Sequence, residues 1–249
     1  MCCFSREVES VTDTKIFARE STSPMQFLVY EMVYSATQDL AMILPIPVPA
    51  QTPENGVRFI SLEKYPAFFR DLDSGFPKPK ASRGTFSFGG DKSAAAPKLA
   101  VVEVGSYEAS FVPKVADFAR LDERFRLPTS VWNVLPQYKP FGFAVFKLKK
   151  EAQKPHPMAF EFLRANPQQL FFPTIHIHDG QVHAKADFDH TLYAQFDRGH
   201  RIAPQQWKES PQPAGMFMNI PKCEGLLEKG AHAYKRTIRG TQKNEDIVA

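Results

Sequence analysis

The sequence has few cysteines and no long run of apolar residues. Three cysteines occur in 249 residues, and two of them, Cys2 and Cys3, are adjacent. Adjacent cysteines form a disulfide only with strain, and an odd number leaves one thiol over, so we expect reduced thiols and no disulfide framework. The chain also lacks both the roughly eighteen apolar residues of a membrane span and the charged and apolar segments of a secretory leader. The sequence therefore predicts a soluble, cytoplasmic protein.

Several functional signatures are missing as well. No Gly-rich phosphate loop, nucleophile elbow, zinc-finger spacing or internal repeat is present. The formal net charge of +4 is too small to predict binding to nucleic acid. What the chain does have is a hydrophobic fraction of 43% with 22 phenylalanines, which is enough to build a large core. The composition therefore predicts a folded protein but does not predict its function.

Apolar runs between turn-forming residues predict more strands than helices. Residues 26–48 contain two such runs around a polar segment, which favours a β-hairpin. Residues 141–149 and 158–163 have the pattern of further strands. An apolar stripe at helical spacing predicts one helix over residues 113–127. We predict an α+β fold that is mainly antiparallel β with a few short helices.

The distribution of Gly, Pro and polar residues predicts the domain organisation. Residues 73–98 are rich in Gly, Pro, Ser, Ala and Lys without periodicity, which is typical of a long surface loop. We predict a single α+β domain over residues 1–200 that contains this loop. Residues 201–249 are predicted to be a polar C-terminal extension, and its last twenty or so residues are expected to fray.

The stretch HIHDGQVH, from His176 to His183, has three histidines in eight residues. The pair Asp179-Gly180 is a strong signal for a two-residue type I′ hairpin turn, because both central positions of that turn need a positive φ. Such a hairpin pairs His176 with His183. Side chains alternate along strands, so His176, His178 and His183 would share one face.

Three imidazoles on one face predict a mononuclear metal site of copper, iron or zinc. An open coordination position would let the metal activate water or dioxygen, as in a metal-dependent oxidoreductase or hydrolase that acts on a small-molecule substrate. A surface hairpin with polar residues outward gives the same alternation, so the pattern alone does not decide. The residues considered as additional ligands or hydrogen-bonding supports are His190, Asp187, Asp189, Cys2 and Cys3.

Two other classes of function remain open. The first is a non-catalytic protein-interaction module, whose proline-rich loops and basic tail dock a protein partner or a second copy of the chain. The second is an N-terminal nucleophile hydrolase, in which removal of Met1 would place the thiol of Cys2 beside a free amine. The cysteines could equally be buried residues without chemistry. The sequence does not decide whether the protein is an enzyme, and no catalytic residue is assigned.

The first fifth of the chain, roughly, resembles an uncharacterised bacterial domain family of unknown function. The resemblance lies in an early cysteine followed by KIFAR (Lys15 to Arg19), LVYEMVYSA (Leu28 to Ala36) and LAMILPIPVP (Leu40 to Pro49). It implies no activity. Members of that family usually follow a secretory leader, so the resemblance implies export where the rest of the sequence predicts a cytoplasmic protein.

Overall fold

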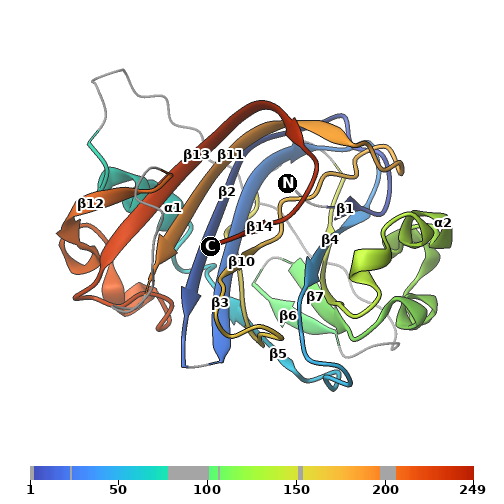
Figure 1. Ribbon diagram of the computed structural model, residues 1–249, viewed down its shortest axis with the longest axis horizontal. Helices are drawn as coiled ribbons and strands as arrows, with labels where there is room; N and C mark the ends of the chain where they lie inside the picture. The colour runs from blue at the N-terminus through green and yellow to red at the C-terminus, as the bar shows by residue number, and fades with distance from the viewer. Residues whose placement is uncertain (1–2, 23, 78–100, 106, 151–153, 197–205) are drawn as a thin grey trace.

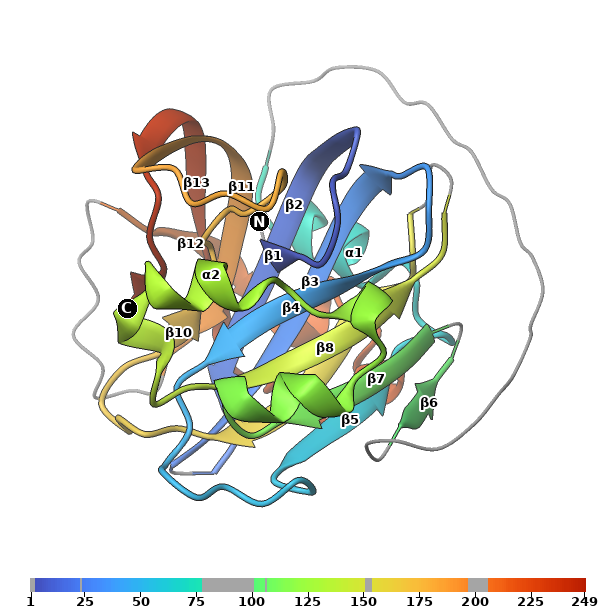
Figure 2. The same ribbon diagram turned by 90° about the vertical axis from the view of Figure 1, so that its right-hand side faces the viewer.

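Two β-sheets packed face to face form the body of the protein in the computed structural model (Figure 1, Figure 2). The structure describes residues 3–22, 24–77, 101–105, 107–150, 154–196 and 206–249. Figure 2 shows short helical segments crossing the outer face of the smaller sheet, and helix α1 lies on the far side of the larger one. The arrangement is a β-sandwich with a covered face on each side.

The larger sheet has seven strands in the described residues and the smaller sheet has five. In spatial order the larger sheet consists of β12 (Lys208–Pro213), β13 (His232–Lys243), β11 (Lys185–Gln195), β2 (Ser10–Glu20), β3 (Met25–Ser35), β9 (Met158–Leu163) and β5 (Val57–Ser61). The smaller sheet consists of β1 (Cys3–Phe4), β4 (Leu40–Ile46), β8 (Gly142–Leu148), β7 (Tyr107–Val112) and β6 (Val102–Val104). Strands β10 (Phe171–Phe172) and β14 (Ile247–Val248) pair with each other.

The described strands are almost all antiparallel. Only β11 and β2 run parallel, and the other neighbouring pairs in the described sheets are antiparallel. The helices are short: α1 (Phe68–Ser74), α2 (Thr129–Asn133) and the 3₁₀ segments η1 (Val115–Arg120), η2 (Glu123–Phe125), η3 (Pro136–Tyr138), η4 (Ala214–Met216) and η5 (Ile220–Lys222). The prediction of a β-rich, mainly antiparallel fold with a few short helices is confirmed.

Alternating side chains fill three apolar regions. Consecutive residues of a strand point to opposite faces, so a strand covered on both faces needs apolar residues at successive positions. Strand β3 meets this requirement: Leu28 and Tyr30 face the space between the sheets, whereas Phe27 and Val29 face outward. The unbroken apolar run of this strand is therefore explained by burial on both faces.

The three apolar regions cover different faces of the two sheets. The central core lies between the sheets and includes Leu28, Tyr30, Leu44, Phe146 and Phe160. The α1 cluster covers the outer face of the larger sheet and includes Phe17, Val29, Phe68, Phe69 and Leu226. The α2 cluster covers the outer face of the smaller sheet and includes Ile43, Phe118, Trp132, Phe143 and Ile177.

Two local predictions are wrong. The apolar runs within residues 26–48 do form strands β3 and β4, but these strands belong to different sheets and do not make a hairpin. The polar segment between them carries the chain from one sheet to the other. The helix expected over residues 113–127 is broken into η1 and η2, because Leu121 is extended and the carboxylate of Asp122 caps a new turn by accepting a hydrogen bond from the backbone N–H of Arg124.

The C-terminal residues, some of which were expected to fray, are paired. Strand β13 lies between β12 and β11, and β14 pairs with β10, so backbone hydrogen bonds hold this part of the chain against the sandwich. The division into residues 1–200 and 201–249 stays a prediction. The loop predicted at residues 73–98 lies largely outside the described residues. None of the helices in the described ranges is long and apolar enough to cross a membrane.

Candidate functional site

The histidine-containing segment, His176 to His183, lies between strand β11 and the outer face of the smaller sheet. Ile175 and Ile177 pack into the α2 cluster, while His176 and His178 project from the opposite side of the backbone. The segment touches the smaller sheet through Ile177, which forms an isolated parallel bridge with Cys3. The alternation along residues 175–178 therefore separates apolar from imidazole side chains.

The predicted hairpin at residues 176–183 is wrong. Gly180 has a φ of +75°, but Asp179 does not have a positive φ, so the type I′ turn is not formed. The two arms do not pair with each other. Asn244 lies between them and donates hydrogen bonds from its side-chain amide to the carbonyls of His176 and His183, both at 2.9 Å.

His183 is separated from the other two histidines. Its side chain is 56% exposed, and its Nε2 lies 2.8 Å from the carboxylate of Asp179. That carboxylate also accepts a hydrogen bond from the backbone N–H of Gln181 at 3.0 Å. A polar turn at the surface thus explains this histidine.

His190 replaces His183 in the ring cluster. The rings of His176 and His178 stack with centroids 5.3 Å apart, and those of His176 and His190 stack at 5.1 Å. Phe188 contacts both His176 and His190, with centroids at 4.3 and 4.9 Å. Phe4 lies against His178. The result is a row of three imidazoles between phenylalanine rings.

This geometry contradicts the predicted metal site. A metal needs ring nitrogens whose in-plane lone pairs converge at about 2 Å, whereas stacked rings direct their lone pairs along nearly parallel planes. Within the described residues, no group of three or more His, Cys, Asp or Glu is placed so that it could hold a metal ion. The interpretation of His176, His178 and His183 as a copper, iron or zinc site, and the metal-dependent enzyme built on it, is therefore wrong.

Two members of the histidine row, His176 and His178, are held in the neutral form. Burial lowers the pKa of His176 to about 2 and that of His178 to about 4. The Nε2 atoms of these two residues, and both ring nitrogens of His190, have no hydrogen-bond partner among the residues that the structure describes. The three imidazoles therefore pack as aromatic rings, and burying their unpaired nitrogens costs folding free energy.

The acidic residues considered as supports point elsewhere. Asp187 is exposed on β11. Asp189 accepts a hydrogen bond from the backbone N–H of Asp13 at 2.9 Å and forms an ion pair with Arg239 at 3.2 Å. Because strand residues alternate, His190 lies on the opposite face of β11 from both carboxylates. They are not partners of the imidazoles.

The cysteines do not form a nucleophilic site within the described residues. Cys2 lies outside those residues, and Cys3 is fully buried in β1. Cys223 is also fully buried, and its thiol contacts the carbonyl of Asn219 at 3.3 Å. Burial raises the pKa of the Cys223 thiol to about 12, which disfavours the reactive thiolate.

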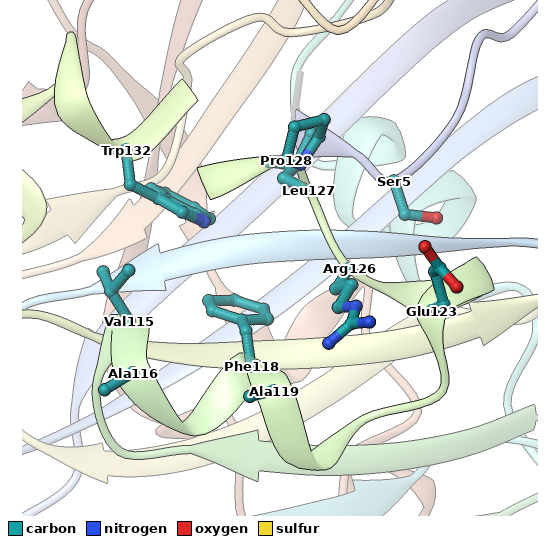
Figure 3. A pocket seen from close by; sticks show the side chains of 10 residues that line it. All are labelled: Ser5, Val115, Ala116, Phe118, Ala119, Glu123, Arg126, Leu127, Pro128 and Trp132. Atoms are coloured by element: carbon teal, nitrogen blue, oxygen red, sulfur yellow. The ribbon is translucent and has the colours of Figure 1, made fainter. Parts of the chain in front are cut away.

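A pocket that the sequence pattern did not indicate lies over the smaller sheet (Figure 3). Its volume is about 600 Å³, and its walls come from η1, the extended residues that follow η2, and α2. Figure 3 shows Phe118 and Trp132 on one side and Arg126 and Glu123 on the other. The pocket therefore combines an aromatic wall with charged side chains.

Part of the pocket was missed because the sequence places Phe118 and Arg126 on one predicted helix. A continuous helix would have directed Phe118 and Arg126 onto the same apolar face. The break after η1 instead turns the chain, and α2 then returns Trp132 over Phe118, with ring centroids 5.3 Å apart. The Asp122 cap before η2 is the one local signal of this break.

Comparison with known proteins finds a shared fold. No family model matches the sequence, and no curated protein sequence matches it significantly. Among solved structures, the chain is similar to baculovirus P35, with a TM-score of 0.52 and 14% identity over 99% of this chain and 98% of P35. At this identity the likeness shows the fold alone. The resemblance to a bacterial domain family stays a prediction.

Two further structures of P35 are more distant from this chain. One is a mutated baculovirus P35 after caspase cleavage, with a TM-score of 0.47 and 12% identity over 95% of this chain and 98% of that chain. The other is the complex of caspase-8 with P35, with a TM-score of 0.46 and 11% identity over 95% of both chains.

Proposed function

We propose that this protein is a non-catalytic protein-binding protein whose partner is a protease of the caspase type. The observation that carries the proposal is the P35-like fold along nearly the whole of both chains. P35 has been crystallised in a complex with caspase-8, and a mutated P35 has been crystallised after caspase cleavage. A fold does not by itself determine function, so the proposal depends on a direct binding test.

The buried cysteines and histidines are compatible with this proposal. The thiol of Cys223 is buried with a raised pKa, and Cys3 is buried in a strand. The imidazoles of His176 and His178 stack on other rings in the neutral form. These groups contribute packing in the described part of the chain, which is the role expected of the body of a binding protein.

The edge of the smaller sheet offers a surface for a protein partner. Strand β6 ends the sheet order, so its outer side has no neighbouring strand among the described residues. Val101 and Val102, at the start of this edge, are 49% and 43% exposed. An exposed sheet edge with apolar side chains favours pairing with an extended segment of another protein.

The test uses the full chain and purified caspase-8. Residual caspase activity is measured with a fluorogenic peptide after incubation with increasing amounts of the protein, and the mixture is examined by gel filtration and intact mass. The proposal predicts loss of caspase activity at near-stoichiometric ratios and co-elution of the two proteins. A caspase-8 sample with its active-site cysteine alkylated controls for binding outside the active site. Full activity and separate elution with caspase-8 and with a panel of other caspases would refute the proposal.

The contribution of the sheet edge can be measured separately. Val102→Lys places a charge on the β6 edge and is expected to weaken the complex by about tenfold. Val134→Lys is the matched control, because Val134 is 61% exposed next to α2, away from this edge. Equal affinities of both variants for the caspase would place the binding surface elsewhere.

A further inference from the structure

The pocket over the smaller sheet has the size of a small-molecule site. Its volume of about 600 Å³ lies within the range of roughly 300–1,000 Å³ that is usual for small-molecule sites. Its lining comes from η1, Glu123 of η2, the extended chain from Arg126 to Pro128, α2 and Ser5 (Figure 3). It is separate from the β6 edge, so it concerns a different activity from the proposed protease binding.

One wall of the pocket is rigid and aromatic. The ring of Phe118 stacks on the indole of Trp132 with an interplanar angle of 19°. Phe143 of β8 packs against both rings of this pair, with its ring centroid 4.7 Å from that of Trp132 and 5.0 Å from that of Phe118. These contacts fix the orientation of the indole. Phe118 and Trp132 are each only 4% exposed, so an apolar ligand would meet the aromatic wall in a fixed position.

The indole N–H of Trp132 has no acceptor. Its Nε1 is buried and has no hydrogen-bond partner among the described residues. A buried tryptophan N–H usually finds a partner, since an unpaired buried donor is costly. Figure 3 shows the indole reaching across the pocket with its nitrogen at the end that faces Arg126. An acceptor bound in the pocket would satisfy this donor.

Arg126 supplies a positive charge that is not used in the described structure. Two nearby arginines are paired: Arg120 forms an ion pair with Glu54, and Arg124 forms one with Asp122 at 2.8 Å. The half-buried side chain of Arg126 lines the pocket and has no ion pair with any residue that the structure describes. Its planar guanidinium can donate two parallel hydrogen bonds to a carboxylate.

We propose that this pocket binds a small planar organic monocarboxylate. The carboxylate would accept hydrogen bonds from the guanidinium of Arg126 and from the indole of Trp132, and the flat apolar body would lie against Phe118. Glu123 lies at the same pocket and has no ion pair in the described structure, so its negative charge disfavours ligands with a second anionic group. The charge, shape and size of the pocket together define this class of ligand.

Nuclear magnetic resonance of the ¹⁵N-labelled full chain tests the proposal, with 2-naphthoate as the probe. The chain has two tryptophans, so its spectrum contains two indole N–H signals. Trp132→Phe and Trp207→Phe assign them independently, which covers the case in which one variant does not fold. Addition of 2-naphthoate should shift the Trp132 signal saturably and leave the Trp207 signal in place.

Two comparisons establish which groups bind the carboxylate. Arg126→Met should weaken 2-naphthoate binding by at least about tenfold, whereas Arg124→Met, the matched control, should change it by less than about twofold. The neutral probe 2-naphthylmethanol should bind at least about tenfold more weakly than 2-naphthoate. The proposal is overturned if the Trp132 signal does not shift saturably, if the two probes bind equally, or if Arg126→Met binds as well as the unchanged protein.

Discussion

Acidification should destabilise this protein through its buried histidines, and replacing one of them should reduce the effect. Burial lowers the pKa of His176 to about 2 and that of His178 to about 4, from an ordinary value of 6.5. In the folded protein both imidazoles therefore stay neutral well below neutral pH. In the unfolded chain they take up protons as the pH falls below about 6.5.

The sign and size follow from proton linkage. The unfolded state binds more protons than the folded state between the two pKa values, so stability is fully present above about pH 6.5 and is lost as the pH falls towards the folded values. At pH 4.5, about two units below the unfolded value, each imidazole costs on the order of 2–3 kcal/mol. Both together cost about 5 kcal/mol, which is comparable to the total stability of a small protein at about 5–15 kcal/mol.

Urea unfolding of His176→Gln, followed by tryptophan fluorescence at several pH values between 7 and 4.5, measures this term. The variant should lose about 2–3 kcal/mol less than the unchanged protein over that interval. Carboxylates with a raised pKa, such as Asp246 at about 6, change stability in the opposite direction, but they are common to both proteins and cancel in the difference. His183→Gln is the control, because His183 is exposed. If the pH curves of His176→Gln and the unchanged protein are parallel, the burial argument is wrong.

Two further predictions concern stability at neutral pH. Arg164→Met should cost about 3–5 kcal/mol, because Arg164 is only 4% exposed and its guanidinium donates to two backbone carbonyls and a carboxylate. Arg58→Met should cost less than about 1 kcal/mol, because the Arg58 side chain, which pairs with Glu161, is 58% exposed. Equal losses in urea unfolding would contradict this. Gly142→Ala should cost about 1–3 kcal/mol, because its Cβ would lie 2.5 Å from the ring of Phe111. Gly230→Ala should change the stability by less than about 0.5 kcal/mol, because its Cβ would have no neighbour within 4 Å. An unchanged melting temperature of Gly142→Ala would show that the Phe111 ring can move aside.

The strands were largely predictable because their signal is local. Strands β8 and β9 lie where the alternation of residues 141–149 and 158–163 predicts them. Their partners were not predictable, because pairing joins distant parts of the chain: Leu40 lies opposite Leu148, and Lys185 lies opposite Lys243. The apolar runs within residues 26–48 have the spacing of a hairpin, and only the choice of sheet makes that interpretation wrong.

The candidate sites were less predictable than the strands. The sequence shows which residues of a strand share a face, but it does not show which distant strand lies opposite. His190 joins His176 because the histidine-containing segment lies over β11, a contact for which residues 176–183 carry no signal. The pocket depends in the same way on the turn that returns Trp132 over Phe118. Both arrangements are tertiary and override the local pattern.

The histidine-containing segment does not form a hairpin because the side chain of Asn244 binds the backbone groups of His176 and His183 that would pair with each other. The carboxylate of Asp246 accepts hydrogen bonds from the N–H groups of Thr174 and Ile175 at 2.8 and 3.0 Å, and the side chain of Asn244 accepts one from the N–H of His176 at 2.7 Å. Backbone donors bound in this way are not available to a ladder. The position of the imidazoles is therefore coupled to the docking of residues 244–246. Protonation of the histidines should release the histidine-containing segment and residues 244–246 at the same time.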